Sequence, residues 1–160
     1  MLLYIVRHAP AGEPDEHNYP DDSLRPITDK GAKRFRRLVR LLAAEGLDPG
    51  RIATSPFLRC QQTAEILSAE TPRNADLTVL DELAPGAELA PLLTWAQHHI
   101  TEDVALVGHA PDVAHWTEQL LGAEVGSIEF SKGAIAAINI DIQSSSRGQL
   151  LWFVKPKLVN

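Results

Sequence analysis

Residues 2–8 of the sequence, LLYIVRH, join a short apolar run directly to Arg7 and His8. An uninterrupted apolar run of this length is typical of a strand that is buried on both faces of a parallel sheet. Similar runs recur further along, at residues 51–54, 77–80 and 104–107. Helical patterns separate these runs. The alternation predicts an α/β fold with three layers, α/β/α, in which helices cover both faces of a mostly parallel central sheet.

The longest predicted helix has a clear start, a clear end and two different faces. Thr28 is its expected N-cap, the helix runs from Asp29 to about Glu45, and Gly46 ends it. Apolar residues at helical spacing form one face. The other face is basic and carries Lys33, Arg34, Arg36, Arg37 and Arg40. A basic face is usually solvated, and the alternative is that it docks an acidic partner.

Three further helices are predicted. One follows the second strand, one ends near His98, and one starts at Pro111, in a position that tolerates proline. Residues 134–142 and 149–154 form a predicted antiparallel pair, joined by a turn at residues 144–148.

The remaining segments limit the number of domains. Residues 10–26 hold four of the 11 prolines and few apolar residues, which predicts an ordered surface loop. Whether this loop closes over a site is left open. Between Glu82 and Val104 there is room for one loop and one helix, so no cap domain is expected. Residues 1–160 are predicted to form a single domain, because domains usually have ~100–200 residues.

Composition excludes several classes of protein. The chain has 21 acidic residues against 15 Lys and Arg, a formal net charge of −6, which argues against nucleic acid or an anionic membrane as a partner. No apolar run approaches the ~20 residues of a membrane span, and the opening run is too short for a signal peptide and lacks a basic leader. The single cysteine excludes an internal disulfide and a multi-cysteine zinc site. These features favour a cytoplasmic location.

Polar side chains follow the predicted parallel strands. Arg7 and His8 come after the first strand, Arg59 after the second and His109 after the fourth. Because the carboxyl ends of parallel strands share one edge of an open sheet, where ligands bind, these side chains are expected to converge. Two guanidinium groups at one site favour a phosphate-like dianion, which arginine binds bidentately. The imidazole of His109 is a further donor to the same anion.

His8 is the candidate nucleophile of this predicted site. Positive neighbours penalise its protonation and so keep the imidazole neutral. Its other ring nitrogen needs an acceptor to set the tautomer, which is expected to be a backbone carbonyl. Asp81 and Glu82 follow the third strand, and either carboxyl group could protonate a leaving group.

Other reactive side chains are interpreted as structural. Cys60 follows Arg59, but no glycine-rich phosphate cradle comes after it, so a buried helix thiol is expected rather than a nucleophile. No spacing among the other histidines resembles a zinc site, and neither a metal nor a cofactor is predicted. These histidines are expected at the surface or in structural contacts: His17, His98, His99 and His115.

Four motifs occur in order along the chain: RHA at residues 7–9, RPITDKG at 25–31, SPFLRCQQTA at 55–64 and GHAP at 108–111. In order and spacing they resemble the motifs of the histidine phosphatase superfamily, and the resemblance covers nearly the whole chain. The short length and the final strands make the chain most similar to the SixA-type phosphohistidine phosphatases. The resemblance implies a phosphoglycerate mutase-like fold without a cap domain.

The resemblance also implies a role for each matching residue. His8 would be the nucleophile and would form a phosphohistidine intermediate that water then hydrolyses. The phosphoryl oxygens would be held by Arg7, Arg59 and His109. Glu82 matches the position of the proton donor in many members. The chain departs from the family pattern at Ala9, where glycine is common, and in the sequence around Glu82, which matches only loosely.

The expected substrate is phosphohistidine on a protein partner of the histidine-containing phosphotransfer type. An alkoxide is a poor leaving group, since its parent has a pKa near the ~15.7 of water, whereas imidazole titrates near ~6.5 and leaves with little help. The alternatives are a small-molecule phosphomonoesterase or mutase, and a non-catalytic module that binds a phosphorylated partner. The identity of the acid is open between Glu82, Asp81, Asp21, Asp22 and no acid at all.

Overall fold

A six-stranded sheet organises the chain in the computed structural model, which describes residues 1–144 and 147–158. The strand order is β3-β2-β4-β1-β5-β6. The strands are β1 (Leu2–Arg7), β2 (Arg51–Thr54), β3 (Asp76–Val79), β4 (Val104–Gly108), β5 (Ile135–Ile140) and β6 (Gly148–Val154). The first four strands pair in parallel, whereas β5 and β6 are antiparallel to their neighbours. The predicted mostly parallel sheet with an antiparallel C-terminal pair is confirmed.

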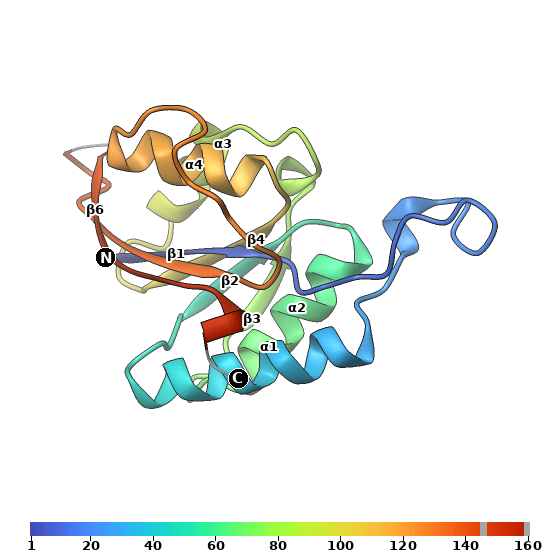
Figure 1. Cartoon of the computed structure of the whole chain (residues 1–160). Coiled ribbons are helices and arrows are strands. Elements are labelled where there is room, and N and C mark those ends of the chain that lie inside the picture. Colours follow the sequence, from blue (N-terminus) through green and yellow to red (C-terminus); the bar gives the residue numbers. More distant parts are fainter. Residues whose placement is uncertain (145–146, 159–160) are drawn as a thin grey trace.

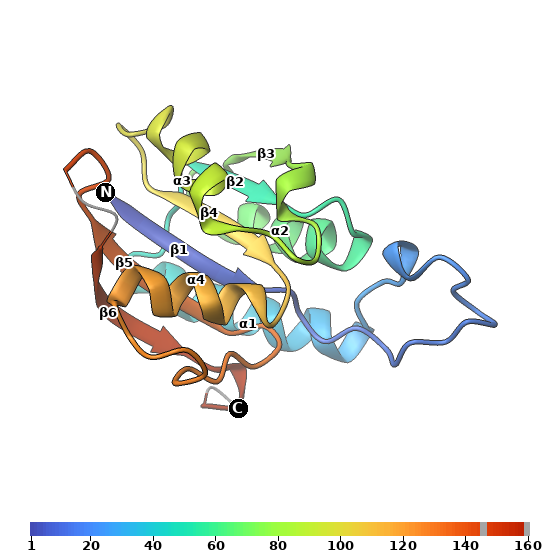
Figure 2. The same cartoon turned by 90° about the horizontal axis from the view of Figure 1, so that it is seen from above.

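Helices cover both faces of this sheet, as Figures 1 and 2 show. The helices α1 (Asp29–Ala44) and α2 (Leu58–Ala69) lie on one face, and α3 (Leu89–Gln97) and α4 (Asp112–Leu121) lie on the other. Short 3₁₀ helices form at η1 (Asp22–Leu24), η2 (Asp81–Leu83) and η3 (Pro156–Leu158). The predicted three-layer α/β/α architecture is therefore confirmed.

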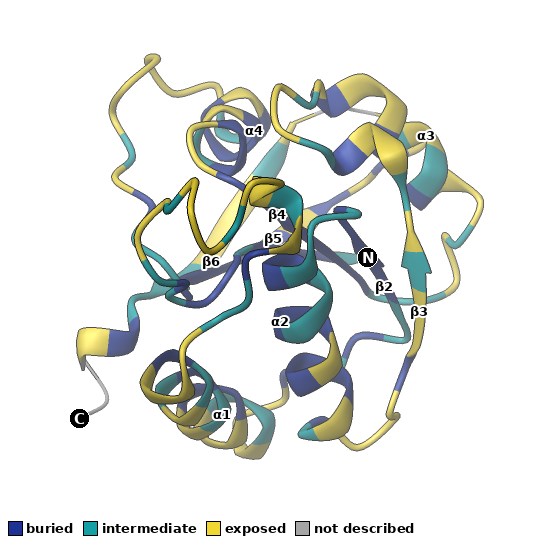
Figure 3. Cartoon of the chain, turned by 90° about the vertical axis from the view of Figure 1, so that its right-hand side faces the viewer, coloured by how far each residue is buried: buried dark blue, intermediate teal, exposed yellow. Residues whose placement is uncertain are grey.

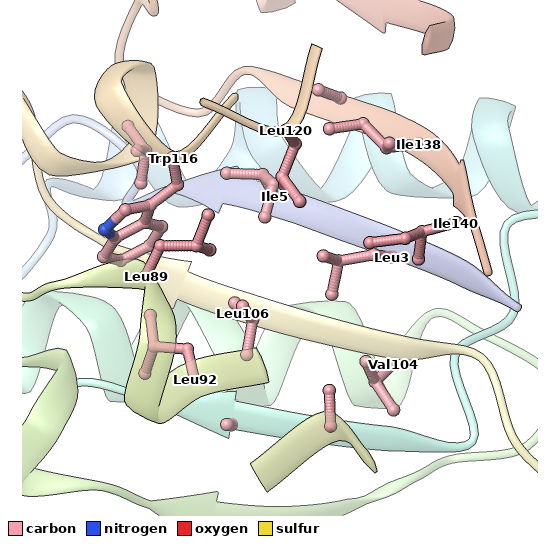
Figure 4. Close-up of a cluster of buried hydrophobic side chains, with 14 of the residues drawn as sticks. Leu3, Ile5, Leu89, Leu92, Val104, Leu106, Trp116, Leu120, Ile138 and Ile140 are labelled. Atoms are coloured by element: carbon pink, nitrogen blue, oxygen red, sulfur yellow. The ribbon is translucent and has the colours of Figure 1, made fainter. Parts of the chain in front are cut away.

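Strand β1 supplies side chains to the core on both faces of the sheet. Leu3 and Ile5 pack into the cluster under α3 and α4, which Figure 4 shows, and Tyr4 and Val6 pack into the cluster against α1 and α2. All of these side chains are 1% exposed or less. Successive side chains of a strand point to opposite faces, so an unbroken apolar run suits a strand that is covered twice.

The predicted ends of the first long helix are correct to within one residue. The Thr28 side chain accepts a hydrogen bond from the Gly31 amide at 3.0 Å, which makes it the N-cap of α1. Gly46 follows the end of this helix with a φ of 101°, a left-handed conformation that glycine adopts without steric cost.

Several predicted boundaries differ from the structure. β3 lies one residue earlier than predicted, and as the edge strand it leaves Leu77 and Val79 38% and 50% exposed. α4 begins at Asp112, and Pro111 is its N-cap rather than its first helical residue. Proline suits the N-cap as well as the first helical position, because neither position needs an amide hydrogen. β5 spans Ile135–Ile140 and is shorter than predicted, because its pairing with β6 starts at Ile135 and ends at Ile140. The predicted turn at 144–148 includes residues 145–146, which lie outside the described residues.

The part of the chain between β3 and β4 is short. It holds η2 and α3 and no inserted cap domain, as predicted. Within the described ranges, no helix has the length and apolar character that crossing a membrane requires.

Gly108 at the end of β4 provides a test of the packing. A Cβ there would lie 2.8 Å from the Trp116 ring, which is 1% exposed, whereas a Cβ at Gly12 would meet nothing within 4 Å. We expect Gly108→Ala to lower the free energy of unfolding by about 1–3 kcal/mol through overpacking. Gly12→Ala, the matched control, is expected to be neutral or to stabilise by up to about 1 kcal/mol. Urea titrations measure both, and equal stabilities would contradict the packing argument.

Candidate active site

The carboxyl ends of β1, β2 and β4 meet at one edge of the sheet, the side that Figure 3 presents to the viewer. Arg7 pairs with Gly108 in the register of β1 and β4, and the His8 amide donates to the Gly108 carbonyl at 3.0 Å. The ring centroids of His8 and His109 are 5.4 Å apart, edge to face. The predicted convergence of residues that lie about a hundred positions apart is therefore seen in the fold.

His8 is buried and held in one tautomer. His8 is only 6% exposed, and its Nδ1 lies 2.8 Å from the Ala9 carbonyl oxygen. Because a carbonyl only accepts, Nδ1 must carry the proton and Nε2 must keep its lone pair. The acceptor is a backbone carbonyl, as the sequence predicted. Burial, together with the nearby His109, Arg59 and Arg7 side chains, lowers the pKa of His8 to about 3. The imidazole is therefore neutral at neutral pH.

Ala9, the departure from the expected glycine, fits its position without strain. Its side chain is fully buried, and its backbone is not among the described non-glycine residues that adopt a positive φ. The Ala9 amide donates to Thr63 Oγ1 at 2.9 Å, and that hydroxyl donates to the Arg59 carbonyl at 2.6 Å. These bonds tie the segment after His8 to α2, and neither of them requires glycine at residue 9.

Arg7 lies beside His8 at the end of β1. Its Nη1 donates to the Phe130 carbonyl at 2.7 Å, while its Nε is buried and has no hydrogen-bond partner among the described residues. Burial lowers the pKa of Arg7 from its ordinary value. An arginine remains charged despite such a shift, so Arg7 brings a half-buried cation with an unused donor to the site.

Arg59 reaches the site from the first turn of α2. Its guanidinium group lies 4.8 Å from the centroid of the Phe57 ring, and its Nε is buried without a hydrogen-bond partner in the described ranges. Nη1 donates to the Asp22 carbonyl at 2.9 Å, and Nη2 lies 3.1 Å from Asp22 Oδ2. Buried polar groups are nearly always hydrogen-bonded, so the unpartnered Nε of each arginine is a donor that the described residues leave unsatisfied.

His109 completes the predicted set. Its Nε2 lies 2.8 Å from Ser55 Oγ and 3.5 Å from Cys60 Sγ. Burial, reinforced by Arg59, lowers the pKa of His109 to about 4. Cys60 is fully buried, and burial raises the pKa of its thiol to about 12. A thiol that stays protonated is a poor nucleophile, which supports the interpretation of Cys60 as a buried helix residue.

The loop over residues 10–26 reaches this site through η1. Asp22 Oδ1 accepts from Arg25 Nε at 2.8 Å while Oδ2 faces Arg59, and the hydrogen bond from Arg25 holds the pKa of Asp22 below its usual range. Arg25, only 7% exposed, also donates to the Gly12 carbonyl. Sequence reasoning assigned no role to Arg25 or Ser55, although both stand inside the quoted motifs. Their presence in those motifs was the signal that could have found them.

The candidate acids fall into two groups. Asp22 contacts an arginine of the site but is held as a carboxylate, and Asp21 caps η1 by accepting from the Ser23 amide at 2.9 Å. Asp81 and Glu82 lie in η2 and are exposed. Neither side chain of that pair forms a hydrogen bond or ion pair with a described residue. The structure therefore brings Arg7, His8, Arg59 and His109 together and leaves Glu82 outside their contacts.

The remaining histidines are structural or exposed, as predicted. His98 Nδ1 lies 2.8 Å from the Thr94 carbonyl, His99 packs against the Trp95 ring at 4.7 Å, and His17 and His115 are exposed. Within residues 1–144 and 147–158, no group of three histidine, cysteine or acidic side chains could hold a metal ion.

Comparison with known proteins identifies the class to which this fold and site belong. The family model of the histidine phosphatase superfamily (branch 1) matches residues 3–85, just over half of the 160 residues. An uncharacterised protein of Picosynechococcus sp. is 34% identical over 98% of both chains. The phosphohistidine phosphatase SixA of Escherichia coli is 28% identical and aligns over 98% of this chain and 94% of its own.

A solved structure of similar shape agrees with these matches. The structure described as the protein histidine phosphatase SixA complexed with tungstate superposes with a TM-score of 0.87, 26% identity and complete coverage of both chains. The chain therefore belongs to the histidine phosphatase superfamily. Its sequence and phosphoglycerate mutase-like fold make it a SixA-like phosphatase, which confirms the resemblance seen in the motifs.

The depressed histidine pKa values predict how stability depends on pH. His8 titrates at about 3 when folded and near 6.5 when unfolded, so the unfolded chain binds more protons between these values. The free energy of unfolding should therefore fall as the pH is lowered from 6.5 towards 3. In His8→Asn this dependence should be shallower, because the proton uptake of that side chain on unfolding is lost. Urea titrations across this pH range measure the slope, and an unchanged slope in the variant would contradict the assignment.

Proposed function

We propose that this chain hydrolyses phosphorylated substrates through a covalent intermediate on His8. The observation that carries the proposal is the His8 tautomer: Nδ1 donates to the Ala9 carbonyl, and Nε2 keeps its lone pair in an imidazole whose charged neighbours are Arg59 and Arg7. Nε2 would attack phosphorus and form a P–N bond while the bond to the leaving group breaks. Water would then attack the phosphohistidine, releasing inorganic phosphate and restoring the neutral imidazole.

Arg7, Arg59 and His109 are the proposed ligands of the transferring phosphoryl group. Both arginines remain charged, and each has a buried Nε without a partner among the described residues. In phosphoryl transfer the protein contributes mainly positioning and charge stabilisation. Guanidinium groups that are held in place supply both the positioning and the charge stabilisation. Their donors need not reorganise as negative charge moves to the phosphoryl oxygens.

Protein phosphohistidine is the proposed substrate class. The imidazole leaving group titrates near ~6.5 and needs little help from an acid. This chemistry agrees with a Glu82 that contacts none of the other four side chains. The absence of a cap between η2 and β4 suits a histidine presented on another protein, and one relative is named a phosphohistidine phosphatase. A cytoplasmic location and the lack of a metal or cofactor remain predictions.

The nucleophile is tested by trapping the phosphoenzyme. Incubation with a phosphorylated histidine-containing transfer domain, followed by a rapid quench, should leave an acid-labile, base-stable label on the wild type. His8→Ala should lose the label and at least on the order of a thousandfold in turnover, because the attacking atom is gone. His17→Ala, which removes an exposed histidine, is the matched control and should be unchanged. A fully labelled His8→Ala variant would refute the proposal.

Glu82→Gln tests the leaving-group argument. With a phosphohistidine substrate the rate should stay within about threefold of the wild type, because the leaving ring can take its proton from water at its other nitrogen, which titrates near ~6.5, and then departs as neutral imidazole without a positioned acid. Steady-state kinetics on the phosphorylated transfer domain and on an aryl phosphate measure the effect. A loss of ~100-fold or more on the protein substrate would identify Glu82 as a general acid, and would favour the phosphomonoesterase alternative.

A further inference from the structure

A second cationic pocket adjoins the site at Arg7. It has a volume of about 330 Å³ and is formed by the end of β1, the side of α1, the segment before β5, and η3. The residues that matter for its chemistry are Arg7, Arg34, Glu129, Ser131, Lys132 and Lys157. Arg7 is the one member of this group that the proposed mechanism uses.

Four cationic side chains line this pocket beside one carboxylate, that of Glu129. Arg34, Lys132 and Lys157 form no ion pair with any described residue. The carboxylate of Glu129 is 89% exposed and lies 3.2 Å from Lys155 Nζ, so it is already paired at the rim. Cations gathered in a hollow raise the local concentration of anions, and in a chain of net charge −6 such a gathering stands out.

Two buried donors at this pocket have no partner. Ser131 Oγ and Arg7 Nε are both buried, and neither forms a hydrogen bond with a described residue. Native proteins leave few buried polar groups unsatisfied, and a group of this kind often serves to bind an ion or a ligand. Arg7 and Ser131 both line this pocket together with Arg34, Lys132 and Lys157, so the ligand that suits it is an anion.

The pocket is held rigidly against the nucleophile segment. The Gly133 amide lies 3.2 Å from the Arg7 carbonyl and 3.0 Å from the His8 carbonyl, and it donates to both. The turn at Gly133 has a φ of 77°, and a Cβ there would lie 3.1 Å from the Pro156 ring of η3. The segment before β5 is thus anchored to the end of β1. An anion in the pocket would share the Arg7 guanidinium with a phosphoryl group at His8.

The basic face of α1 extends this pocket along the surface. Arg36 and Arg40 are engaged by Glu70, with Nε to carboxylate distances of 2.9 and 2.6 Å. Lys30, Arg34 and Arg37 lie three or four positions apart and are therefore neighbours on the helix surface. None of these three forms an ion pair with a described residue. A row of free cations that starts at the pocket suits an extended acidic surface better than a single small anion.

We propose that the pocket between Arg7 and Lys157 is a subsite for an acidic side chain of the protein substrate, close to its phosphohistidine. The inference rests on the proposed function of His8. The carboxylate would accept from Lys132 and Lys157 in the pocket that Arg7 and Ser131 also line, and acidic residues further along the partner would face the cations of α1. The subsite would thereby position a phosphoprotein and discriminate it from small phosphate esters.

The test compares two charge-matched variants. Lys132→Ala/Lys157→Ala removes cations of the pocket, and Arg51→Ala/Arg73→Ala removes the same charge at the opposite, amino end of β2 and β3. Each variant is assayed on a phosphorylated transfer domain with acidic side chains around its phosphohistidine. The same domain with those side chains changed to Asn and Gln, an aryl phosphate, and a bisphosphorylated ester complete the panel.

The pocket variant should lose about tenfold in kcat/KM on the acidic domain. The loss should come mainly from a higher KM, because the lost contact stabilises the bound substrate and the transition state equally. On the neutralised domain and the aryl phosphate it should match the wild type, which also shows that it folds. The arginine control should match the wild type throughout. Equal losses in both variants, equal losses on both domains, or a loss confined to the bisphosphorylated ester would each overturn the subsite. A wild type that hydrolyses nothing in the panel would instead refute the proposed function.

Discussion

The parallel pairing of β1 with β4 is the constraint on which the rest of the structure depends. It places Arg7 opposite Gly108, so that the chain leaves both strands at one edge and His8 and His109 lie edge to face. The hydrogen bond from the His8 amide to the Gly108 carbonyl extends this pairing by one residue into the site. Helices on both faces bury the pairing, and beyond its end His8 and His109 are only 6% and 4% exposed.

Burial and nearby positive charge both lower the pKa of the two histidines, whereas the arginines of the site stay charged. Burial is the largest cause of the lowered pKa of both His8 and His109, and Arg59 adds to the effect in each case. The high intrinsic pKa of a guanidinium keeps Arg7 and Arg59 charged in the same surroundings. The proposed nucleophilic role of His8 needs a neutral imidazole, because protonation would remove the lone pair of Nε2.

The overall acidity of the chain hides an uneven distribution of charge. With a net charge of −6, the molecule still gathers cations around Arg7 and Arg59 and along one row of α1. Asp22 is the acidic counterpart inside the site, held between Arg25 and Arg59 by the loop over residues 10–26. Local charge of this kind governs which anions approach the strand ends, whereas the total describes only the average surface.

The apolar runs and the residues that follow them were enough to predict the parallel strands, the caps of α1 and the convergence of Arg7, His8, Arg59 and His109, because the ends of parallel strands share one edge of the sheet whatever the loops do. The folded chain was needed to show which donors have no partner, that Asp22 and Arg25 enter the site, and that Glu82 makes no contact with it. Those facts depend on the directions of side chains from loops and short 3₁₀ turns. Periodicity constrains regular elements, but it says nothing about where an irregular segment folds back.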